Sequence, residues 1–352
     1  MPRKMRLLLA VCVFKSKLLF YSVHKIEAKY YEKLDQEFVR CHLCPVNCRI
    51  APSHEGICMI RRNEGGMLIA TEYGKTIALN IDPIEKKPLY HFKPGSQILS
   101  VGPNGCNFGC IFCQNWSISQ VKTNARYISA RNLVKLAGSN GSVGVAFTYT
   151  EPLIWFEYLF DAARLLKESG FATVIVSNGF INEAPARELF RHIDAANFDL
   201  KSIRAEFYRK ICRGKLEDVL RTIKIAVEMG IHVELTNLLI PGYNDSDDEI
   251  EKLVDWVAQL GADIPMHFSR YFPHYKLDAP ATPEERLIFA SKIAKKKLNY
   301  VYLGNVSDNI GNDTNCLKCG ATLIKRNGYR IDLAGIDNGK CVGCGEESGI
   351  EV

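Results

Sequence analysis

The sequence predicts an α/β fold: a partial (βα)6 barrel with small cysteine-rich metal-binding flanks at both ends. Two observations support this fold class. Between residues 97 and 306, short apolar runs typical of buried strands alternate with stretches of helical periodicity. Toward each end of the chain, by contrast, the sequence is polar and bears clustered cysteines. Successive βα units imply a parallel sheet with right-handed crossovers, and six strands are too few to close an eight-stranded barrel.

The expected strands are apolar runs at residues 96–102, 143–149, 172–177, 195–200, 232–240 and 265–272. In a parallel α/β sheet, reactive groups lie at the carboxyl ends of the strands. We therefore expect functional side chains at, or directly after, the ends of these runs.

Two helical patterns carry clear end signals. Pro152 suits the first turn of a helix over residues 152–169. Gly230 is a natural stop for a helix over residues 215–230. These helices fit between successive strands, as the alternating fold requires.

Two further helices carry capping signals at their starts. Ser246 and Glu249 predict a capping box for a helix over residues 246–261. A second capping signal, Thr282, Pro283 and Glu285, predicts the start of a helix over residues 282–297. This helix is expected to end on lysines, whose charge suits the helix dipole.

The composition is that of an ordinary globular chain. Of its 352 residues, 47% are hydrophobic and 24% are charged, and a net charge of +6 does not by itself argue for nucleic-acid binding. The basic first residues precede an apolar run far shorter than the roughly 20 residues of a membrane span. Lys15 and Lys17 interrupt that run. We expect no membrane segment and a cytoplasmic location.

The chain divides into four predicted segments. They are an extension of uncertain status over 1–23, a four-cysteine domain over 24–84, the core domain over 85–310 and a zinc-ribbon or rubredoxin-like domain over 311–352. Neither flank is long enough to build a large core, so bound metal would supply stability that burial cannot.

Thirteen cysteines are the most informative feature of the sequence. Cys12 and Cys212 stand alone, and each is expected to be a small buried apolar residue. The others form three clusters: Cys41, Cys44, Cys48 and Cys58; Cys106, Cys110 and Cys113; Cys316, Cys319, Cys341 and Cys344. Such short spacings indicate metal or iron–sulfur ligation in a reducing compartment.

The central cluster, Cys106, Cys110 and Cys113, offers three thiolates where a metal usually takes four ligands. Three thiolates can bind three irons of a cubane cluster and leave the fourth iron open, as in catalytic metal sites. Gly105 and Gly109 let the loop curl around a bulky cluster. Two alternatives stay open: a zinc site completed by a distant His or Cys, and an electron-transfer cluster with its fourth ligand elsewhere.

The C-x3-C-x-aromatic-C pattern of Cys106, Cys110, Phe112 and Cys113 resembles the signature of the radical S-adenosylmethionine (SAM) superfamily. "TYTEP" (148–152) stands where these enzymes carry a Gly-Gly-Glu-Pro-like motif. Three later stretches resemble the pyruvate formate-lyase activase branch: "VSNG" (176–179), "FDLKS" (198–202) and "LIPGYND" (239–245).

A larger set of motifs resembles the AmmeMemoRadiSam system radical SAM protein family. The set covers nearly everything from residue 26 to residue 350 and comprises "CHLCPVNCRI", "DPIEKKPLYHFKPG", "CNFGCIFCQNWSISQ", "MHFSRYFPHYKL", "YVYLGNV" and the terminal "CLKCG…CVGCG". The family name implies a Memo-like protein as a partner.

The resemblance implies a [4Fe-4S] cluster on the triplet, with SAM chelating the open iron. Reductive cleavage of SAM would give methionine and a 5′-deoxyadenosyl radical, and the radical would abstract hydrogen from a substrate. Reduction requires a low potential, so a ferredoxin- or flavodoxin-type electron donor is implied.

The resemblance also implies roles for residues at the strand ends. Phe112 would pack beside the adenine. Tyr149, Thr150 and Glu151 would line the methionine end, with Glu151 or nearby backbone accepting from the ammonium. The candidates around the ribose and carboxylate are Ser177, Asn178, Asp199 and Lys201.

The sequence departs from these motifs in two places. Tyr149 and Thr150 replace two glycines, which makes close backbone approach less free, and Val176 stands where the activase branch often has Asp. Asp199 and Lys201 could instead be a strand-end polar pair without a ligand. Near the sixth strand, three polar side chains have two possible roles: they face the substrate, or they are polar residues whose hydrogen bonds the protein itself satisfies. They are His267, Arg270 and His274.

The flanking cysteine sets predict separate metal centres. The C-terminal set has C-x2-C pairs followed by Gly320 and Gly345, and its four thiolates form a closed site for structural zinc or a rubredoxin-like iron. The N-terminal set could hold zinc or an auxiliary iron–sulfur cluster, and its spacing does not decide between them.

Three functions remain at this point. The first is a radical SAM enzyme of unknown substrate, which could be a protein. The second is an activase that makes a glycyl radical in a partner enzyme. The third is a nonenzymatic metal-binding module for nucleic acid or protein, which would require a salt-steep affinity for RNA or DNA if nucleic acid is its ligand.

Overall fold

The structure is a computed structural model that describes residues 25–306 and 311–352. The extension predicted over 1–23, together with Cys12, lies outside the described residues. No helix in the described ranges combines the length and apolar character needed to cross a membrane.

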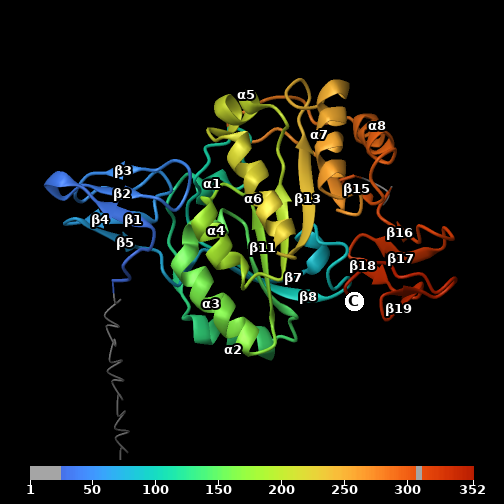
Figure 1. Cartoon of the computed structure of the whole chain (residues 1–352), viewed down its shortest axis with the longest axis horizontal. Helices are drawn as coiled ribbons and strands as arrows, with labels where there is room; N and C mark the ends of the chain where they lie inside the picture. The colour runs from blue at the N-terminus through green and yellow to red at the C-terminus, as the bar shows by residue number, and fades with distance from the viewer. Residues whose placement is uncertain (1–24, 307–310) are drawn as a thin grey trace, which may run out of the picture.

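An eight-stranded sheet forms the centre of the molecule, in the order β15-β14-β13-β12-β11-β10-β8-β7 (Figure 1). All neighbouring pairs are parallel except β7 with β8. The strands are β7 (Ala78–Pro83), β8 (Gln97–Gly102), β10 (Gly144–Phe147), β11 (Ala172–Ser177), β12 (Ala195–Asp199), β13 (His232–Leu239), β14 (Met266–Arg270) and β15 (Val301–Gly304). The predicted α/β fold with a parallel sheet is confirmed, and the sheet gains β7 and β15 at its two edges.

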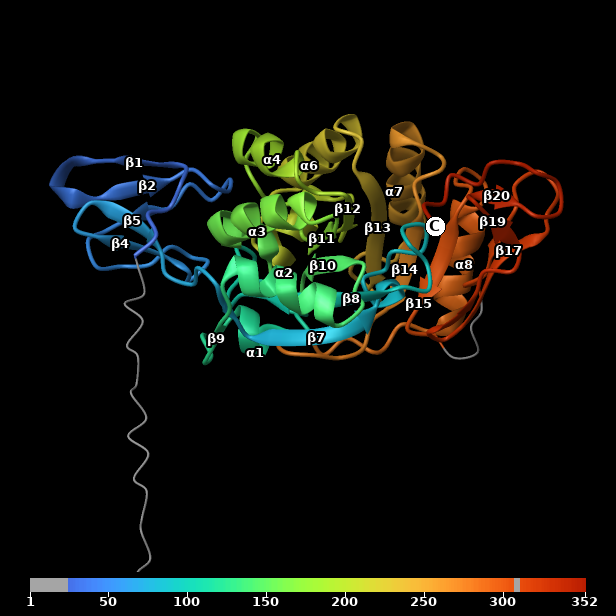
Figure 2. The ribbon, with the colours of Figure 1, turned by 90° about the horizontal axis from the view of Figure 1, so that it is seen from below.

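Helices connect the parallel strands and pack on one face of the sheet. Figure 2 shows α3, α4 and α6 on the same side of the strands. The helices are α1 (Trp116–Ser119), α2 (Ala130–Ser139), the 3-10 turn η3 (Pro152–Trp155), α3 (Phe156–Glu168), α4 (Glu183–Phe190), α5 (Ala205–Phe207), α6 (Leu216–Glu228), α7 (Asp247–Leu260) and α8 (Glu284–Ala294).

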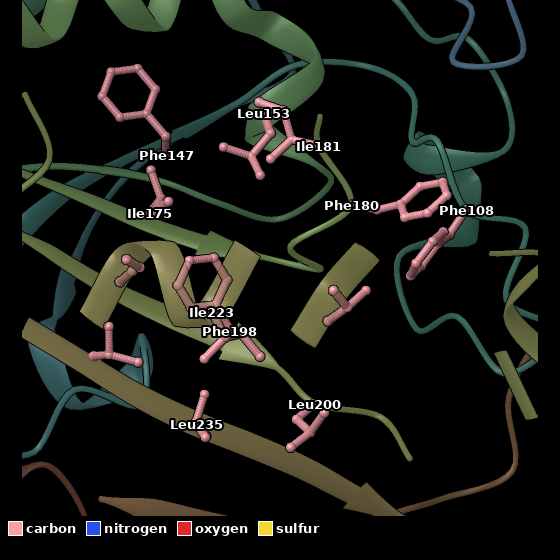
Figure 3. Close-up of a cluster of buried hydrophobic side chains, with 14 of the residues drawn as sticks. Phe108, Phe147, Leu153, Ile175, Phe180, Ile181, Phe198, Leu200, Ile223 and Leu235 are labelled. Carbon is pink, nitrogen blue, oxygen red and sulfur yellow. The ribbon is translucent and has the colours of Figure 1, made fainter. Parts of the chain in front are cut away.

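Large apolar side chains fix the strands against this helical layer. Figure 3 shows Phe147, Ile175, Phe198 and Leu235 from four strands, with Ile223 of α6 beside them. All five are fully buried. Because burial of each such side chain contributes about 1.5–3 kcal/mol, the layer holds the strand ends in a fixed register.

Two expected capping arrangements are wrong in part. The Ser246 hydroxyl accepts from the Glu249 N–H, as predicted. The Glu249 carboxylate, however, does not return to Ser246: it accepts from the Ser202 hydroxyl and pairs with Arg204 at 2.5 Å. Tertiary partners therefore replace the second arm of the capping box.

Thr282 does not cap the last helix of the sheet. Pro283 occupies the N-cap position of α8 without a side-chain cap. The buried Thr282 hydroxyl donates to the Leu239 carbonyl and accepts from the Tyr271 N–H. It thus ties the ends of two strands together instead of starting the helix.

The amino ends of β13 and β14 are closed by the segment that follows β7. The fully buried Glu234 carboxylate accepts the N–H groups of Tyr90 and His91 at 2.8 and 2.7 Å and contacts His267 Nε2 at 2.6 Å. Although burial opposes ionisation, hydrogen bonds from His232 and His267 hold the pKa of Glu234 well below its usual range. Because the amino ends of these strands are covered, a ligand can approach the sheet only from the carboxyl ends of the strands.

The two cysteine-rich flanks lie at opposite ends of the sheet (Figure 1). The N-terminal flank contains β1 (Tyr31–Lys33), β2 (Val39–Cys41), β3 (Arg49–Ile50), β4 (Arg61–Glu64), β5 (Met67–Ala70) and β6 (Lys75–Thr76), the last paired with β9 (Arg126–Tyr127). The C-terminal flank contains β16 (Thr314–Asn315), β17 (Thr322–Asn327), β18 (Arg330–Asp332), β19 (Ile336–Asp337) and β20 (Lys340–Cys341). The predicted domain boundaries stay a prediction, and β7, inside the segment 24–84, pairs with the main sheet.

Candidate active site

A pocket at the carboxyl ends of the strands gathers most of the predicted site residues. Its cavity volume is about 250 Å³, and it is open to solvent on one side. Its lining consists of Cys106, Phe108, Cys110, Phe112, Cys113, Gln114, Asn115, Ser119, Tyr149, Thr150, Glu151, Asn178, Asp199, Lys201, Thr236, Leu238, Ser269 and Asn305. Of the residues predicted to hold the cluster or to contact SAM, only Ser177 does not line the pocket.

The loop after β8 carries the cysteine triplet, and its backbone is held on both sides of Cys110. The Gly109 N–H donates to the Cys212 carbonyl at 2.9 Å, and the Ile111 N–H donates to the Ile211 carbonyl at 3.1 Å. Cys212 is buried, as predicted, but its thiol also hydrogen-bonds with Cys110. The loop is thus fixed by backbone contacts that do not depend on the thiols.

Gly105 and Phe108 position the loop against its neighbours. Gly105 has a φ of +86°, and a Cβ there would lie 2.1 Å from the Cys58 carbonyl oxygen. Only glycine fits this close approach. The Phe108 ring packs on the Phe180 ring with centroids 4.9 Å apart (Figure 3).

The thiols of Cys106, Cys110 and Cys113 line one pocket but are not crowded around one point. Within the described part of the chain, only the C-terminal cysteines bring three or more potential ligand atoms within 4.8 Å of one another. A single zinc ion requires such crowding, because its Zn–S bonds are about 2.3 Å long. The spread of the triplet therefore favours thiolates that bind different irons of a cluster.

Glu151 joins the ends of β10 and β11 at the wall of the pocket. Its buried carboxylate accepts from the Leu153 N–H at 2.9 Å, the Ser177 hydroxyl at 2.7 Å and the Asn178 N–H at 2.8 Å. Burial raises the pKa of Glu151 to about 7, although these three donors oppose the shift. A carboxylate has about four acceptor positions, so Glu151 retains room for one further donor, such as an ammonium in the pocket.

Asn178 links the triplet loop to this carboxylate. Its side-chain amide donates to the Asn107 side-chain oxygen at 3.0 Å and contacts Cys106 Sγ at 3.6 Å. The Ser177 hydroxyl, behind the pocket wall, supports Glu151 from the same strand end.

Tyr149 and Thr150 replace two glycines without filling the pocket. Tyr149 adopts a left-handed φ of +72°, which glycine would adopt freely. Its hydroxyl donates to Asp82 at 2.9 Å and accepts from Asn80 at 3.0 Å. The Thr150 hydroxyl donates to the Pro103 carbonyl at 2.7 Å. Both polar side-chain ends therefore bond to the protein.

Asp199 and Lys201 form an ion pair of 2.9 Å on the pocket wall. The Lys201 ammonium lies 5.9 Å from the centroid of the buried Phe112 ring. The Lys201 carbonyl accepts from the Asn244 side chain, which fixes the backbone of the pair. The pocket thus presents a carboxylate, an ammonium group and an aromatic face beside the triplet.

Comparison with known proteins identifies the family. The sequence profile of the Radical SAM superfamily matches residues 101–257. The chain is 43% identical over 329 residues to the uncharacterized protein MJ0808 of Methanocaldococcus jannaschii, covering 91% of this chain and 98% of that protein. The chain belongs to the radical SAM superfamily.

A further relative and a solved structure are named for an activity or a ligand. The chain is 26% identical to a pyruvate formate-lyase-activating enzyme of Clostridium pasteurianum, over 44% of this chain and 67% of that enzyme. The crystal structure of Streptococcus suis SuiB bound to S-adenosylmethionine has a TM-score of 0.49 and 16% identity, over 60% of this chain and 52% of that one. The finer resemblance to the AmmeMemoRadiSam family stays a prediction.

Radical SAM enzymes hold a [4Fe-4S] cluster and SAM, and they require a reductant. The residues of this pocket fit both groups. Three spread thiolates suit three irons, and the one acceptor position left on Glu151 suits the amino group of SAM. The Lys201 ammonium is paired with Asp199, and it suits a carboxylate or ribose oxygen of SAM as a second partner.

Three predicted substrate-facing residues lie outside this pocket. His267 is buried against Glu234 near the closed end of the sheet. Arg270 pairs with Glu284 at 2.9 Å and donates to the Thr282 carbonyl. His274 forms a backbone bridge with Leu277. His267 and Arg270 are satisfied polar residues, the alternative that the sequence also allowed, and His274 is an exposed loop residue.

Several pocket residues were not singled out from the sequence. Gln114, Asn115 and Ser119 directly follow the triplet, so their proximity was the available signal. The others lie in the carboxyl-terminal halves of later strands or directly after them, and this position was the only signal: Thr236, Leu238, Ser269 and Asn305.

The C-terminal cysteines form a compact group that could hold one metal ion. Cys316 Sγ lies 3.6 Å from Cys344 Sγ, and Cys319 Sγ lies 3.7 Å from Cys341 Sγ. All four lie within 4.8 Å of one another. Four thiolates at this separation fit a tetrahedral ion with no open position, which favours a structural role.

We predict that Cys316→Ser removes this ion and lowers the thermal midpoint of unfolding by roughly 5 °C or more, because metal binding contributes to folding. SAM cleavage by the protein that remains folded should be unchanged. Calorimetry, metal analysis and product analysis check this, with the exposed neighbour Val342→Ala as the control. Lost cleavage with unchanged melting and iron content would contradict a purely structural role.

Proposed function

We propose that this protein is a radical SAM enzyme that generates a 5′-deoxyadenosyl radical and uses it to abstract hydrogen from a substrate. The observation that supports the proposal is one pocket at the strand ends in which the triplet thiols meet Glu151, Asp199 and Lys201. When bound, the [4Fe-4S] cluster and SAM supply the reductive cleavage of the carbon–sulfur bond and the radical.

The chain's own residues bind and orient these groups. Cys106, Cys110 and Cys113 hold the cluster, and the backbone contacts beside Cys110 keep their loop in place. Glu151 accepts from the amino group of SAM, and its three protein donors hold the carboxylate in one orientation. Phe112 is buried next to the triplet and presents an apolar face for the adenine.

The substrate would bind beside the pocket residues that come from the last three strands. They form one wall and are Thr236, Leu238, Ser269 and Asn305, in or directly after the carboxyl-terminal halves of β13, β14 and β15. None of the four side chains is charged: Thr236, Ser269 and Asn305 offer hydrogen-bonding groups, and Leu238 offers an apolar surface. A neutral group, such as a backbone segment or uncharged side chain of a protein, suits this wall.

A second candidate within the same chemistry is activation of a glycyl radical enzyme. The similarity to a pyruvate formate-lyase-activating enzyme favours it. The predicted family resemblance favours a Memo-like protein as the partner instead. Both need a ferredoxin- or flavodoxin-type donor, and both fit the predicted cytoplasmic location.

The test is product analysis with anaerobically reconstituted protein, a low-potential reductant and SAM. We expect slow release of 5′-deoxyadenosine and methionine without substrate, and faster release with the correct partner. A Memo-like protein and a glycyl radical enzyme are added in parallel, and stimulation by one of them identifies the class of substrate. Fully loaded, reduced protein that releases no 5′-deoxyadenosine would refute the proposed function.

A further inference from the structure

The four cysteines of the N-terminal flank line one small cavity. Cys41 ends β2, Cys44 and Cys48 lie on the turn before β3, and Cys58 lies on the loop before β4. Cys41, Cys44 and Cys58 are buried and Cys48 is half-buried. The remaining wall is mostly apolar and includes Leu43, Ile50 and Ile154. Four thiols therefore line one mostly apolar cavity.

The separation of these thiols differs from that of the C-terminal set. Four thiolates on one zinc ion lie about 3.8 Å apart, given Zn–S bonds of about 2.3 Å and tetrahedral geometry. The C-terminal thiols meet this condition, with contacts of 3.6 and 3.7 Å. In the described chain they alone form a group within 4.8 Å, so the N-terminal four are spread more widely.

The distances between the thiols also distinguish two kinds of iron–sulfur cluster. A two-iron cluster places two thiolates on each iron and so requires two close thiol pairs. A four-iron cubane binds each thiolate to a different iron and keeps all four apart. Among the N-terminal thiols, all of which are described, no three lie within 4.8 Å of one another and no pair is joined by a hydrogen bond like those of the C-terminal set. Their geometry resembles that of the triplet.

A buried arginine provides a second, independent observation. Arg61 is 1% exposed and lines the same cavity. Its Nη2 pairs with Glu157, and its Nη1 donates to the Lys29 carbonyl at 2.8 Å and contacts Cys41 Sγ at 3.6 Å. Its Nε finds no acceptor among the described residues. The guanidinium therefore lies against the thiols, where its charge offsets part of the negative charge of a thiolate-bound metal centre.

We propose that Cys41, Cys44, Cys48 and Cys58 hold an auxiliary [4Fe-4S] cluster with a closed set of four thiolate ligands. This site goes beyond the proposed function and does not depend on it. The cluster stands next to the triplet loop, because the Cys58 carbonyl packs against Gly105, the residue before Cys106. The protein therefore carries two four-iron clusters side by side and one mononuclear metal at its C-terminus.

Acid-labile sulfide in the full-length, anaerobically reconstituted protein tests this site. A mononuclear ion carries no sulfide, so the C-terminal site does not contribute. Wild-type protein should contain about eight sulfide ions per chain, four for each cluster. The triple variant Cys106→Ala, Cys110→Ala, Cys113→Ala cannot cleave SAM, yet it should retain about four. The control Cys344→Ala should leave the wild-type count unchanged.

The outcomes separate this proposal from the proposed function. A triple variant with no sulfide and about one additional zinc ion would overturn the cluster, and about two sulfide ions would overturn its four-iron type. If the triple variant does not fold, the wild-type count decides, since about four would leave only one cluster. Reduced wild-type protein should also show spin–spin coupling between the two clusters in its electron paramagnetic resonance spectrum, and the triple variant should not.

Discussion

Cys110→Ala should abolish the pocket's cluster and reduce SAM cleavage to the background rate. Cys110 is buried, and the triplet offers no spare thiolate in the pocket at the required position. The fold should survive, because the Gly109 and Ile111 N–H groups still bond to the carbonyls of Cys212 and Ile211. Iron and sulfide content, together with 5′-deoxyadenosine release, check the prediction.

Cys212→Ala is the matched control for this variant. Cys212 is also a buried cysteine and hydrogen-bonds with Cys110, but its contribution to the loop is its backbone carbonyl, which alanine keeps. Its cluster content and cleavage should stay near those of the wild type. If Cys212→Ala loses the cluster while Cys110→Ala retains it, the assignment of the triplet as ligands is wrong.

Glu151→Gln should retain the cluster but weaken SAM binding by about 1.5–3 kcal/mol, the usual contribution of one charge-assisted hydrogen bond. The amide keeps the size of the carboxylate but loses its charge and one of its two acceptor atoms. The donors Leu153, Ser177 and Asn178 are then only partly satisfied, so stability should also fall. Equilibrium binding of SAM and iron content are measured together.

The control is Glu249→Gln, which changes a similarly buried carboxylate outside the pocket. Glu249 accepts from Ser202 and pairs with Arg204, so its variant should lose stability without losing SAM affinity. Equal losses of affinity in the two variants would show that the effect of Glu151 is only structural.

The pH dependence of SAM binding provides a separate check on Glu151. Burial raises the pKa of this carboxyl to about 7, and a bound ammonium favours its ionised form. Affinity should therefore be highest above pH 7 and should fall by up to about tenfold per pH unit below it. Glu151→Gln should lose this dependence, whereas an equally steep dependence in the variant would assign the titration to another group.

The strands that pack in the core were predictable because their signal is local. The run at 172–177 coincides with β11, since burial on both faces requires a continuous apolar stretch. β7 was not predicted, because only one of the six residues of this edge strand is buried, and it pairs antiparallel with β8. β15 follows the last helix, where its sequence had been noted only as a family motif.

Side-chain partners were less predictable, because distant segments supply them. The rule for a capping box is local, yet Glu249 bonds to Ser202 and Arg204. From the sequence, His267 was a candidate to face the substrate, but the register of β14 places it near the closed end of the sheet beside Glu234. The separations between thiols are likewise three-dimensional, so the spacing of the N-terminal cysteines could not distinguish zinc from a cluster.

The most direct measurement is electron–nuclear double resonance on the reduced wild-type protein with SAM labelled with ¹⁵N in its amino group and ¹⁷O in its carboxylate. If SAM is the fourth ligand of the cluster on Cys106, Cys110 and Cys113, both labels should show hyperfine coupling to that cluster. The variant in which all three of these cysteines are changed to Ala should show no such coupling. A fully loaded, reduced wild-type cluster whose spectrum does not change on adding SAM, and which couples to neither label, would contradict SAM as the fourth ligand.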